Sequence, residues 1–214
     1  MPNSATLYLD LAVNGEASET LCAVLAAALD AAPVASLLIR PSTATDEKAL
    51  KALIALAQNR GIAALLPADV AGAAKLGADG VHVLWAPDVV QQFKSIRGGA
   101  GSGMIVGADA GRTRHDAMEL GEGGADYVAF GVPAHVEDRA RAAERQLGLV
   151  SWWSEVFEIP CVALNVSDTE QARRLAEAGA DFVGVTISGN ETASDAAMRV
   201  RAYSEAVSAP EDAK

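Results

Sequence analysis

Gly77-Ala78-Asp79-Gly80-Val81 is the stretch of sequence that decides the fold, because two later stretches repeat it. These are Gly124-Ala125-Asp126-Tyr127-Val128 and Gly179-Ala180-Asp181-Phe182-Val183. Each copy follows a stretch with helical spacing of apolar residues and precedes a short apolar run. Glycine accepts the left-handed backbone that ends a helix, and the Ala-Asp pair then turns the chain into a strand. We therefore interpret each copy as a helix-to-strand junction.

The spacing of these junctions counts the repeating units of the chain. The copies begin 47 and 55 residues apart, and one β/α unit of a barrel takes about 25–30 residues, so each interval holds two units. The copies would introduce the fourth, sixth and eighth strands, and 214 residues shared among eight units gives about 27 each. Alternating strands and helices indicate a parallel sheet, and eight strands in so short a chain favour closure over an open sheet. We predict a single α/β domain, a (β/α)8 TIM barrel over residues 1–207, with a disordered tail at 208–214.

The apolar runs give the expected positions of the elements. Helices are predicted between the strands, for example over Asp46–Asn59 and Thr169–Ala178, the second with a capped start at Ser167-Asp168. The glycine-rich stretch 98–103 precedes a strand instead of following one, so we interpret it as a helix-to-strand loop and not as a dinucleotide-binding turn. The predicted strands are Thr6–Leu11, Ala35–Arg40, Ala63–Leu66, Gly80–Leu84, Met104–Ala108, Tyr127–Gly131, Cys161–Asn165 and Phe182–Ile187.

Composition excludes several classes of function. The net charge is −11 and no run of lysine or arginine occurs, so a nucleic-acid partner is not expected. No apolar run approaches the length of a membrane span, and the first residues carry no secretory signal, which predicts a soluble cytoplasmic protein. Cys22 and Cys161 are predicted to be buried free thiols. Any phosphate ligand must then be held by local backbone N–H groups and a few placed cations.

Several motifs, in order, resemble the thiamine phosphate synthase and thiazole tautomerase superfamily. Leu76-Gly77-Ala78-Asp79-Gly80-Val81-His82 is similar to its strand-four hallmark. Ile105-Val106-Gly107 resembles its strand-five motif, and the stretches 124–131, 159–164 and 178–181 resemble strands six to eight. The resemblance implies that a hydroxymethylpyrimidine pyrophosphate is joined to a thiazole phosphate with release of pyrophosphate, and that Mg²⁺ takes part. It also implies a phosphorylated small molecule as the ligand.

The residues at the strand ends decide how far this implication holds. The family's Asn-Asp pair after strand three, whose aspartate helps to bind Mg²⁺, aligns with Pro67 and Ala68, with Asp69 one place late. A Thr-x-Thr-Lys segment after strand six is absent. The family's glycine pair after strand seven is Asn165-Val166 here, and a Cβ narrows the approach to a phosphate. The residues that the resemblance points to are Arg40 and Asp109 for catalysis, Asn165, Ser188 and Gly189 for phosphate binding, and Asp88 for the metal.

Several of these residues also have a simpler structural explanation, and for Asp109 the choice between a metal shared with Asp88 and a helix cap stays open. Arg40 either binds an anionic ligand or pairs with Asp10 or Asp69, and Asp88 either binds a metal or caps the next helix. His82 is interpreted as a hydrogen-bonded core histidine in preference to a catalytic one. His135 is a weaker candidate for the histidine that tautomerases use after strand six.

Three functions therefore remain open on the sequence alone: a thiamine phosphate synthase, a non-catalytic or repurposed barrel that binds a phosphorylated small molecule, and a thiazole tautomerase. A homodimer is a further possibility that the sequence leaves open.

Overall fold

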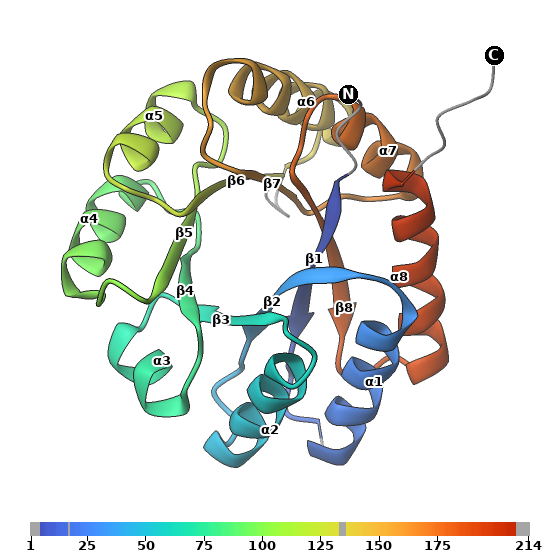
Figure 1. The fold of residues 1–214 in the computed structure, drawn as a ribbon. Helices are drawn as coiled ribbons and strands as arrows, with labels where there is room; N and C mark the ends of the chain where they lie inside the picture. Colours follow the sequence, from blue (N-terminus) through green and yellow to red (C-terminus); the bar gives the residue numbers. More distant parts are fainter. Residues whose placement is uncertain (1–4, 17, 133–135, 209–214) are drawn as a thin grey trace.

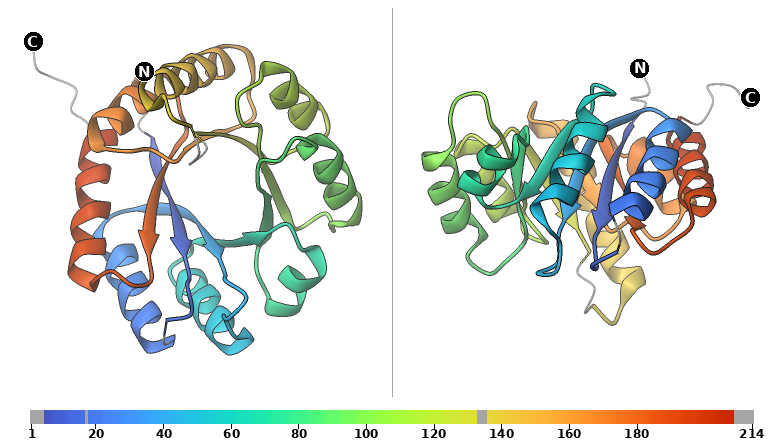
Figure 2. Two further views of the ribbon diagram at one scale, coloured as in Figure 1. Left: turned by 180° about the vertical axis from the view of Figure 1, so that it is seen from behind. Right: turned by 90° about the horizontal axis from the view of Figure 1, so that it is seen from below.

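The protein folds as a closed barrel of eight parallel strands surrounded by helices, seen down the barrel axis in Figure 1 and from behind and from below in Figure 2. A computed structural model describes residues 5–16, 18–132 and 136–208. Each strand pairs with the next along the chain, and β1 closes the barrel against β8. The predicted (β/α)8 barrel is therefore confirmed.

The elements alternate strictly along the described chain. The strands are β1 (Thr6–Ala12), β2 (Val34–Arg40), β3 (Ala63–Pro67), β4 (Gly80–Val83), β5 (Ile105–Asp109), β6 (Tyr127–Gly131), β7 (Cys161–Leu164) and β8 (Phe182–Ser188). The helices are α1 (Ser18–Ala31), α2 (Glu47–Gln58), α3 (Val70–Leu76), α4 (Val89–Gly99), α5 (Arg114–Glu122), α6 (Arg139–Val156), α7 (Thr169–Glu177) and α8 (Ala193–Val207).

The repeated Gly-Ala-Asp junction has the same geometry in all three copies. Gly77, Gly124 and Gly179 have φ angles of 76°, 86° and 98°, which is the left-handed region that favours glycine. The aspartate that follows reaches across to the preceding strand. Its Oδ2 accepts a hydrogen bond from the backbone N–H of Ala64, Val106 or Cys161, at 2.8, 2.7 and 2.8 Å. The repeat thus closes one helix and fixes the register of two neighbouring strands.

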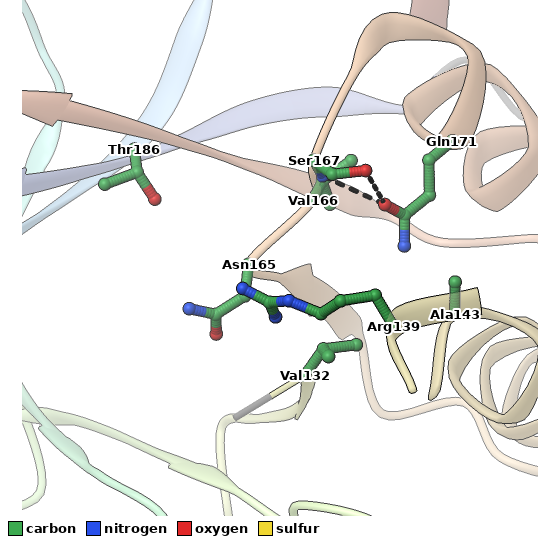
Figure 3. A pocket seen from close by; sticks show the side chains of 8 residues that line it. All are labelled: Val132, Arg139, Ala143, Asn165, Val166, Ser167, Gln171 and Thr186. Carbon is green, nitrogen blue, oxygen red and sulfur yellow. Dashed lines mark hydrogen bonds between the residues drawn. The ribbon is translucent and has the colours of Figure 1, made fainter. Parts of the chain in front are cut away.

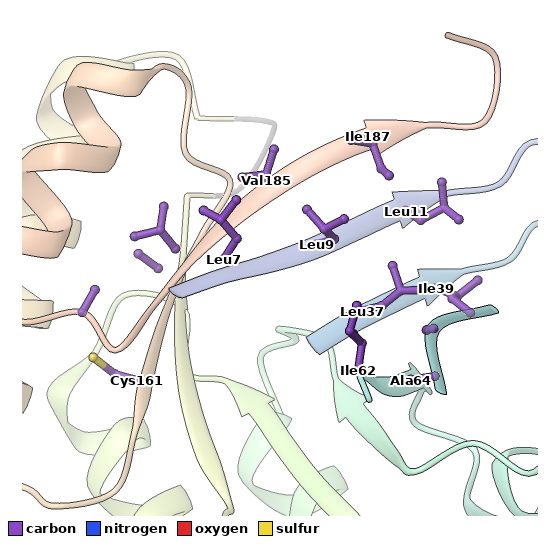
Figure 4. Close-up of a cluster of buried hydrophobic side chains, with 14 of the residues drawn as sticks. Leu7, Leu9, Leu11, Leu37, Ile39, Ile62, Ala64, Cys161, Val185 and Ile187 are labelled. Atoms are coloured by element: carbon purple, nitrogen blue, oxygen red, sulfur yellow. The ribbon is translucent and has the colours of Figure 1, made fainter. Parts of the chain in front are cut away.

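Two apolar layers hold the barrel together. The larger lies between the barrel wall and the helices, and Figure 4 shows its side chains on β1, β2 and β8, including Leu9, Ile39 and Ile187. The smaller fills the inside of the barrel. Its members alternate with the first set along each strand, because successive side chains of a strand point to opposite faces; they are Tyr8, Leu38, Leu65, Tyr127, Ala129, Val162 and Leu164.

The structure adjusts several boundaries predicted from the sequence. Strands β5 and β8 extend to Asp109 and Ser188, while Leu84 and Asn165 lie beyond the ends of β4 and β7. The loop predicted over residues 98–103 begins later, because 98 and 99 are the last residues of α4 and the N–H of Ala100 still bonds to a helix carbonyl. Apart from Ser208, the predicted tail lies outside the described residues.

The two cysteines are free thiols, as predicted, but the predicted burial is correct for Cys161 and wrong for Cys22. Cys161 is buried on β7, and burial raises the pKa of its thiol to about 12, whereas Cys22 is half-buried on α1. In the described part of the chain, no helix is long and apolar enough to cross a membrane.

Candidate active site

The polar residues singled out from the sequence gather at one end of the barrel. Asp109 and Ser188 are the last residues of β5 and β8, Arg40 is the last of β2, and Asn165 directly follows β7. Since all eight strands run in the same direction, their carboxyl ends share one rim. The candidate active site is therefore this rim, where barrel enzymes carry their chemistry.

Asp109 is a buried carboxyl at the rim. Only 9% of the residue is exposed, and its Oδ1 accepts hydrogen bonds from the backbone N–H groups of Gly111, at 2.8 Å, and Gly131, at 3.1 Å. Burial raises its pKa to about 6, although these two bonds act in the opposite direction. A carboxyl that changes its charge near neutral pH, at the rim of a barrel, is suited to hold or exchange a proton.

Gly131 is the point where Asp109 meets Asn165. A Cβ built on Gly131 would lie 2.6 Å from Oδ2 of Asp109 and 3.1 Å from Oδ1 of Asn165, so the two side chains occupy the space that any larger residue at 131 needs. Asn165 has a φ angle of 58°, the only positive φ among the described non-glycine residues. Asparagine tolerates this left-handed conformation better than most residues do.

A pocket of about 260 Å³ opens beside Asn165 (Figure 3). It lies between the ends of β6, β7 and β8 and the start of α6, from which the side chain of Arg139 extends toward Asn165 (Figure 3). On its other side, Ser167 donates both its N–H and its hydroxyl to Oε1 of Gln171, at 2.9 and 2.8 Å. A guanidinium, an amide and hydroxyls make this pocket suitable for an anionic or strongly polar ligand.

Gln146 of α6 joins the ends of two strands beside this pocket. It is buried, and its Nε2 donates to the carbonyls of Phe130 and Leu164, both at 2.7 Å. Its Oε1 accepts a hydrogen bond from Nε2 of Gln171, at 2.9 Å. One side chain thereby satisfies carbonyl groups at the ends of β6 and β7 and fixes the wall of the pocket.

Arg40 forms an ion pair with Asp10 of β1. Its Nε lies 2.5 Å from Oδ1 of Asp10, and the side chains are 37% and 10% exposed. Burial raises the pKa of Asp10, while Arg40 acts to lower it. The structural alternative for Arg40, pairing with Asp10, is therefore present, and a role in ligand binding stays a prediction.

We expect Arg40→Gln to lower the free energy of unfolding at pH 7 by about 1–2 kcal/mol, because it leaves the buried carboxylate of Asp10 without its cation. The double variant Asp10→Asn/Arg40→Gln should recover most of this loss, because it removes both charges. Urea unfolding of the three proteins measures the effect. A double variant as unstable as the single one would contradict this explanation.

His82 lies inside the barrel and is fully buried. Its Nδ1 is 2.8 Å from the hydroxyl of Tyr127, which is 2.9 Å from the hydroxyl of Tyr8. Burial, with a smaller contribution from Arg40, lowers the pKa of His82 to about 3, so the ring is neutral. Within the described structure its Nε2 has no hydrogen-bond partner. These contacts agree with the interpretation of His82 as a hydrogen-bonded core residue.

The predicted phosphate-binding residues of β8 already use their backbone N–H groups. Ser188 N–H donates to Oε1 of Glu191, at 2.6 Å, and Gly189 N–H donates to the carbonyl of Ala12, at 3.0 Å. A phosphate bound to the N–H of Ser188 would have to displace the Glu191 carboxylate. Phosphate binding at Ser188 and Gly189 remains a prediction, and His135 lies outside the described residues.

Asp88, the residue predicted to bind Mg²⁺, already has a hydrogen-bond partner, and metal binding there stays a prediction. Asp88 is exposed at the start of α4, where its Oδ1 accepts from Nε2 of Gln92, at 2.8 Å, and its side chain makes no capping hydrogen bond to the helix backbone. Asp69 caps α3 by accepting from the N–H of Gly72. Among the described residues, no three His, Cys, Asp or Glu side chains gather as a metal-binding group.

The sequence points to Asp109 and Asn165 but not to two further features of the rim. Arg139 carries only a weak signal, which is a cation in the first turn of a helix, where the dipole disfavours it. The sequence spacing of Asp109, Gly131 and Asn165 does not indicate that the two side chains meet at Gly131. Asp109 ends β5, Gly131 ends β6 and Asn165 follows β7, so only the closed sheet brings them together.

The rim of this closed barrel carries a buried carboxyl, an ion pair and a polar pocket. These are features of the class of barrels that hold a small polar ligand at the carboxyl ends of their strands. The family model described as thiamine monophosphate synthase matches residues 10–188. The chain belongs to this family.

Relatives agree with the assignment, and a solved structure shows the same fold. The thiamine-phosphate synthase of Rhodospirillum centenum is 40% identical over 166 residues, covering 75% of this chain and 78% of the relative. That of Erythrobacter litoralis is 39% identical over 159 residues, covering 73% and 72%. The structure of a thiamine phosphate pyrophosphorylase from Pyrococcus furiosus superposes with a TM-score of 0.68 at 20% identity, covering 96% of this chain and 98% of that one, which shows a shared fold.

Proposed function

We propose that this protein is a thiamine-phosphate synthase that joins a hydroxymethylpyrimidine pyrophosphate to a thiazole phosphate and releases pyrophosphate. The observation that carries the proposal is the family match over residues 10–188, together with relatives of that name at up to 40% identity. The rim of the barrel supports it, because a buried carboxyl and a polar pocket lie where such a ligand would bind.

Asp109 is the residue we propose for electrostatic catalysis. Loss of pyrophosphate leaves positive charge on the pyrimidine, and a carboxylate in a dry site stabilises such charge more strongly than water does. Its two backbone hydrogen bonds hold the carboxylate in place before the charge forms. Asn165, on the other side of Gly131, would orient the same substrate through its amide.

The proposal is tested by incubating the purified full chain with both substrates and Mg²⁺ and measuring thiamine phosphate and pyrophosphate. We expect equal amounts of the two products, and a large loss of turnover in Asp109→Asn. Glu122→Gln serves as the control, because that carboxylate is exposed at the end of α5 and belongs to no predicted site. Absence of turnover, with thermal stabilisation by either substrate, would contradict the proposed synthase activity and favour a barrel that only binds its ligand.

A further inference from the structure

We infer that Arg112, Arg141 and Arg145 form a second anion-binding site, for the phosphate or diphosphate group of a small molecule. The three side chains line one pocket of about 310 Å³, between the loop that follows β5 and helix α6. Arg112 and Arg145 also line an adjoining pocket of about 290 Å³ beside Trp85. This site shares no lining residue with the pocket at Asn165, although a further pocket, lined by both Arg139 and Arg141, lies between them. The inference does not rest on the proposed function.

Three arginines and one carboxylate, that of Asp138, line this pocket, so its lining carries excess positive charge. In the described part of the chain, none of the three arginines forms an ion pair, although the protein has a net charge of −11. Other basic residues of the same described ranges do form ion pairs, which are Arg40, Arg60, Lys75, Lys94, Arg97, Arg173, Arg174 and Arg199. An acidic protein that leaves three cations unpaired around one pocket has the charge for an anion there.

The carboxylates that line or adjoin the pocket have other partners. Asp138 accepts a hydrogen bond from the backbone N–H of Arg141, at 3.0 Å, and so caps α6. Asp116 accepts from the hydroxyl of Thr113, at 2.6 Å, at the start of α5. Glu144, next to Arg145 in sequence, pairs with Arg174 of α7, at 2.9 Å. Asp138 and Asp116 keep their charge in these hydrogen bonds, so they reduce but do not cancel the positive charge of the three arginines.

Helix α6 keeps these arginines together against two unfavourable effects. Arg141 and Arg145 are four residues apart and lie on the same side of the helix, where like charges repel. Arg141 also lies in the first turn, where the helix dipole disfavours a cation. A bound phosphate would relieve both effects, and guanidinium groups bind phosphate oxygens in pairs of hydrogen bonds.

The pocket is also connected to Asp109. Arg112 follows Gly111, whose N–H binds the Asp109 carboxylate, and a Cβ on Gly111 would lie 2.2 Å from Trp85. An anion bound to Arg112 would therefore contact the residue that follows Gly111 in sequence, and the N–H of Gly111 positions the Asp109 carboxylate.

The test is calorimetric titration of the full chain with inorganic phosphate and with pyrophosphate, each with Mg²⁺ and with a chelator. We expect binding without Mg²⁺ that weakens as salt is added. Arg141→Gln and Arg145→Gln should each weaken it about fivefold, and the double variant about 20-fold. Arg201→Gln, an exposed arginine of α8, should leave the affinity unchanged.

Three results would overturn the inference: no binding to the wild-type protein, equal affinity in the double variant, or a loss of binding in Arg139→Gln alone, which would place the anion in the pocket at Asn165. Thermal unfolding of each variant checks that the fold is kept. Because the readout is binding and not turnover, failure here leaves the proposed enzyme activity untouched.

Discussion

Asp109→Asn is expected to raise the free energy of unfolding at pH 8 by about 2–3 kcal/mol while lowering turnover by about 100-fold or more. The carboxylate is buried, and its pKa of about 6 lies above the ordinary value of 3.8. Keeping it charged therefore destabilises the folded protein. Asparagine keeps an oxygen that can accept from Gly111 and Gly131 without carrying the charge.

The direction of the stability change and the pH range in which it occurs follow from the pKa of Asp109 in the unfolded and in the folded protein. Between pH 3.8 and about 6 the unfolded carboxyl has lost its proton and the folded one still holds it. The folded wild-type protein then binds more protons, so its stability falls as the pH rises through this window. The variant does not titrate at this position, so its advantage should appear across the window and stay constant above it.

Urea unfolding of both proteins from pH 4 to 8, with steady-state kinetics at pH 8, measures the two effects. Glu122→Gln is the control and should change neither, since that side chain is exposed at the end of α5. If Asp109→Asn is less stable than the wild type at pH 8, the folded protein stabilises the charged carboxylate of Asp109, contrary to this prediction. Unchanged turnover would remove Asp109 from the proposed active site.

Gly107→Ala is expected to lower the free energy of unfolding by about 3–5 kcal/mol, which is a large part of the stability of a typical domain. A Cβ on Gly107 would lie 2.0 Å from a ring carbon of Tyr127. That ring cannot easily move, because it stacks on His82 with centroids 5.7 Å apart and shares hydrogen bonds with His82 and Tyr8. Either the ring, which lies inside the closed barrel, or strand β5, which is part of the barrel wall, must shift.

Denaturant unfolding measures this loss, and two further variants keep it interpretable. Gly148→Ala lies in the middle of α6 with nothing within 4 Å of the new Cβ, so it should be neutral or stabilising by up to about 1 kcal/mol. Gly107→Ala combined with Tyr127→Leu should recover part of the stability, since the smaller side chain leaves room. No recovery would mean that the tyrosine ring is not the cause.

Much of the fold was accessible from the sequence, because its signals are local. The three Gly-Ala-Asp copies require a left-handed glycine and a turn, which depend on neighbouring residues alone. Their spacing then counts eight units. Predicted strand ends erred by one residue at Asp109 and Ser188, since strand ends depend on hydrogen bonds to neighbouring strands.

The candidate site was only partly accessible, because its contacts join distant residues. The sequence alone determined the barrel, the family resemblance and the candidates at the strand ends. Only the tertiary structure decided that Arg40 pairs with Asp10, that Asp109 is buried beside Asn165, and that Glu191 takes the N–H of Ser188. The physical reason is that pairing and burial depend on which strands closure brings together, and no local pattern encodes that distance.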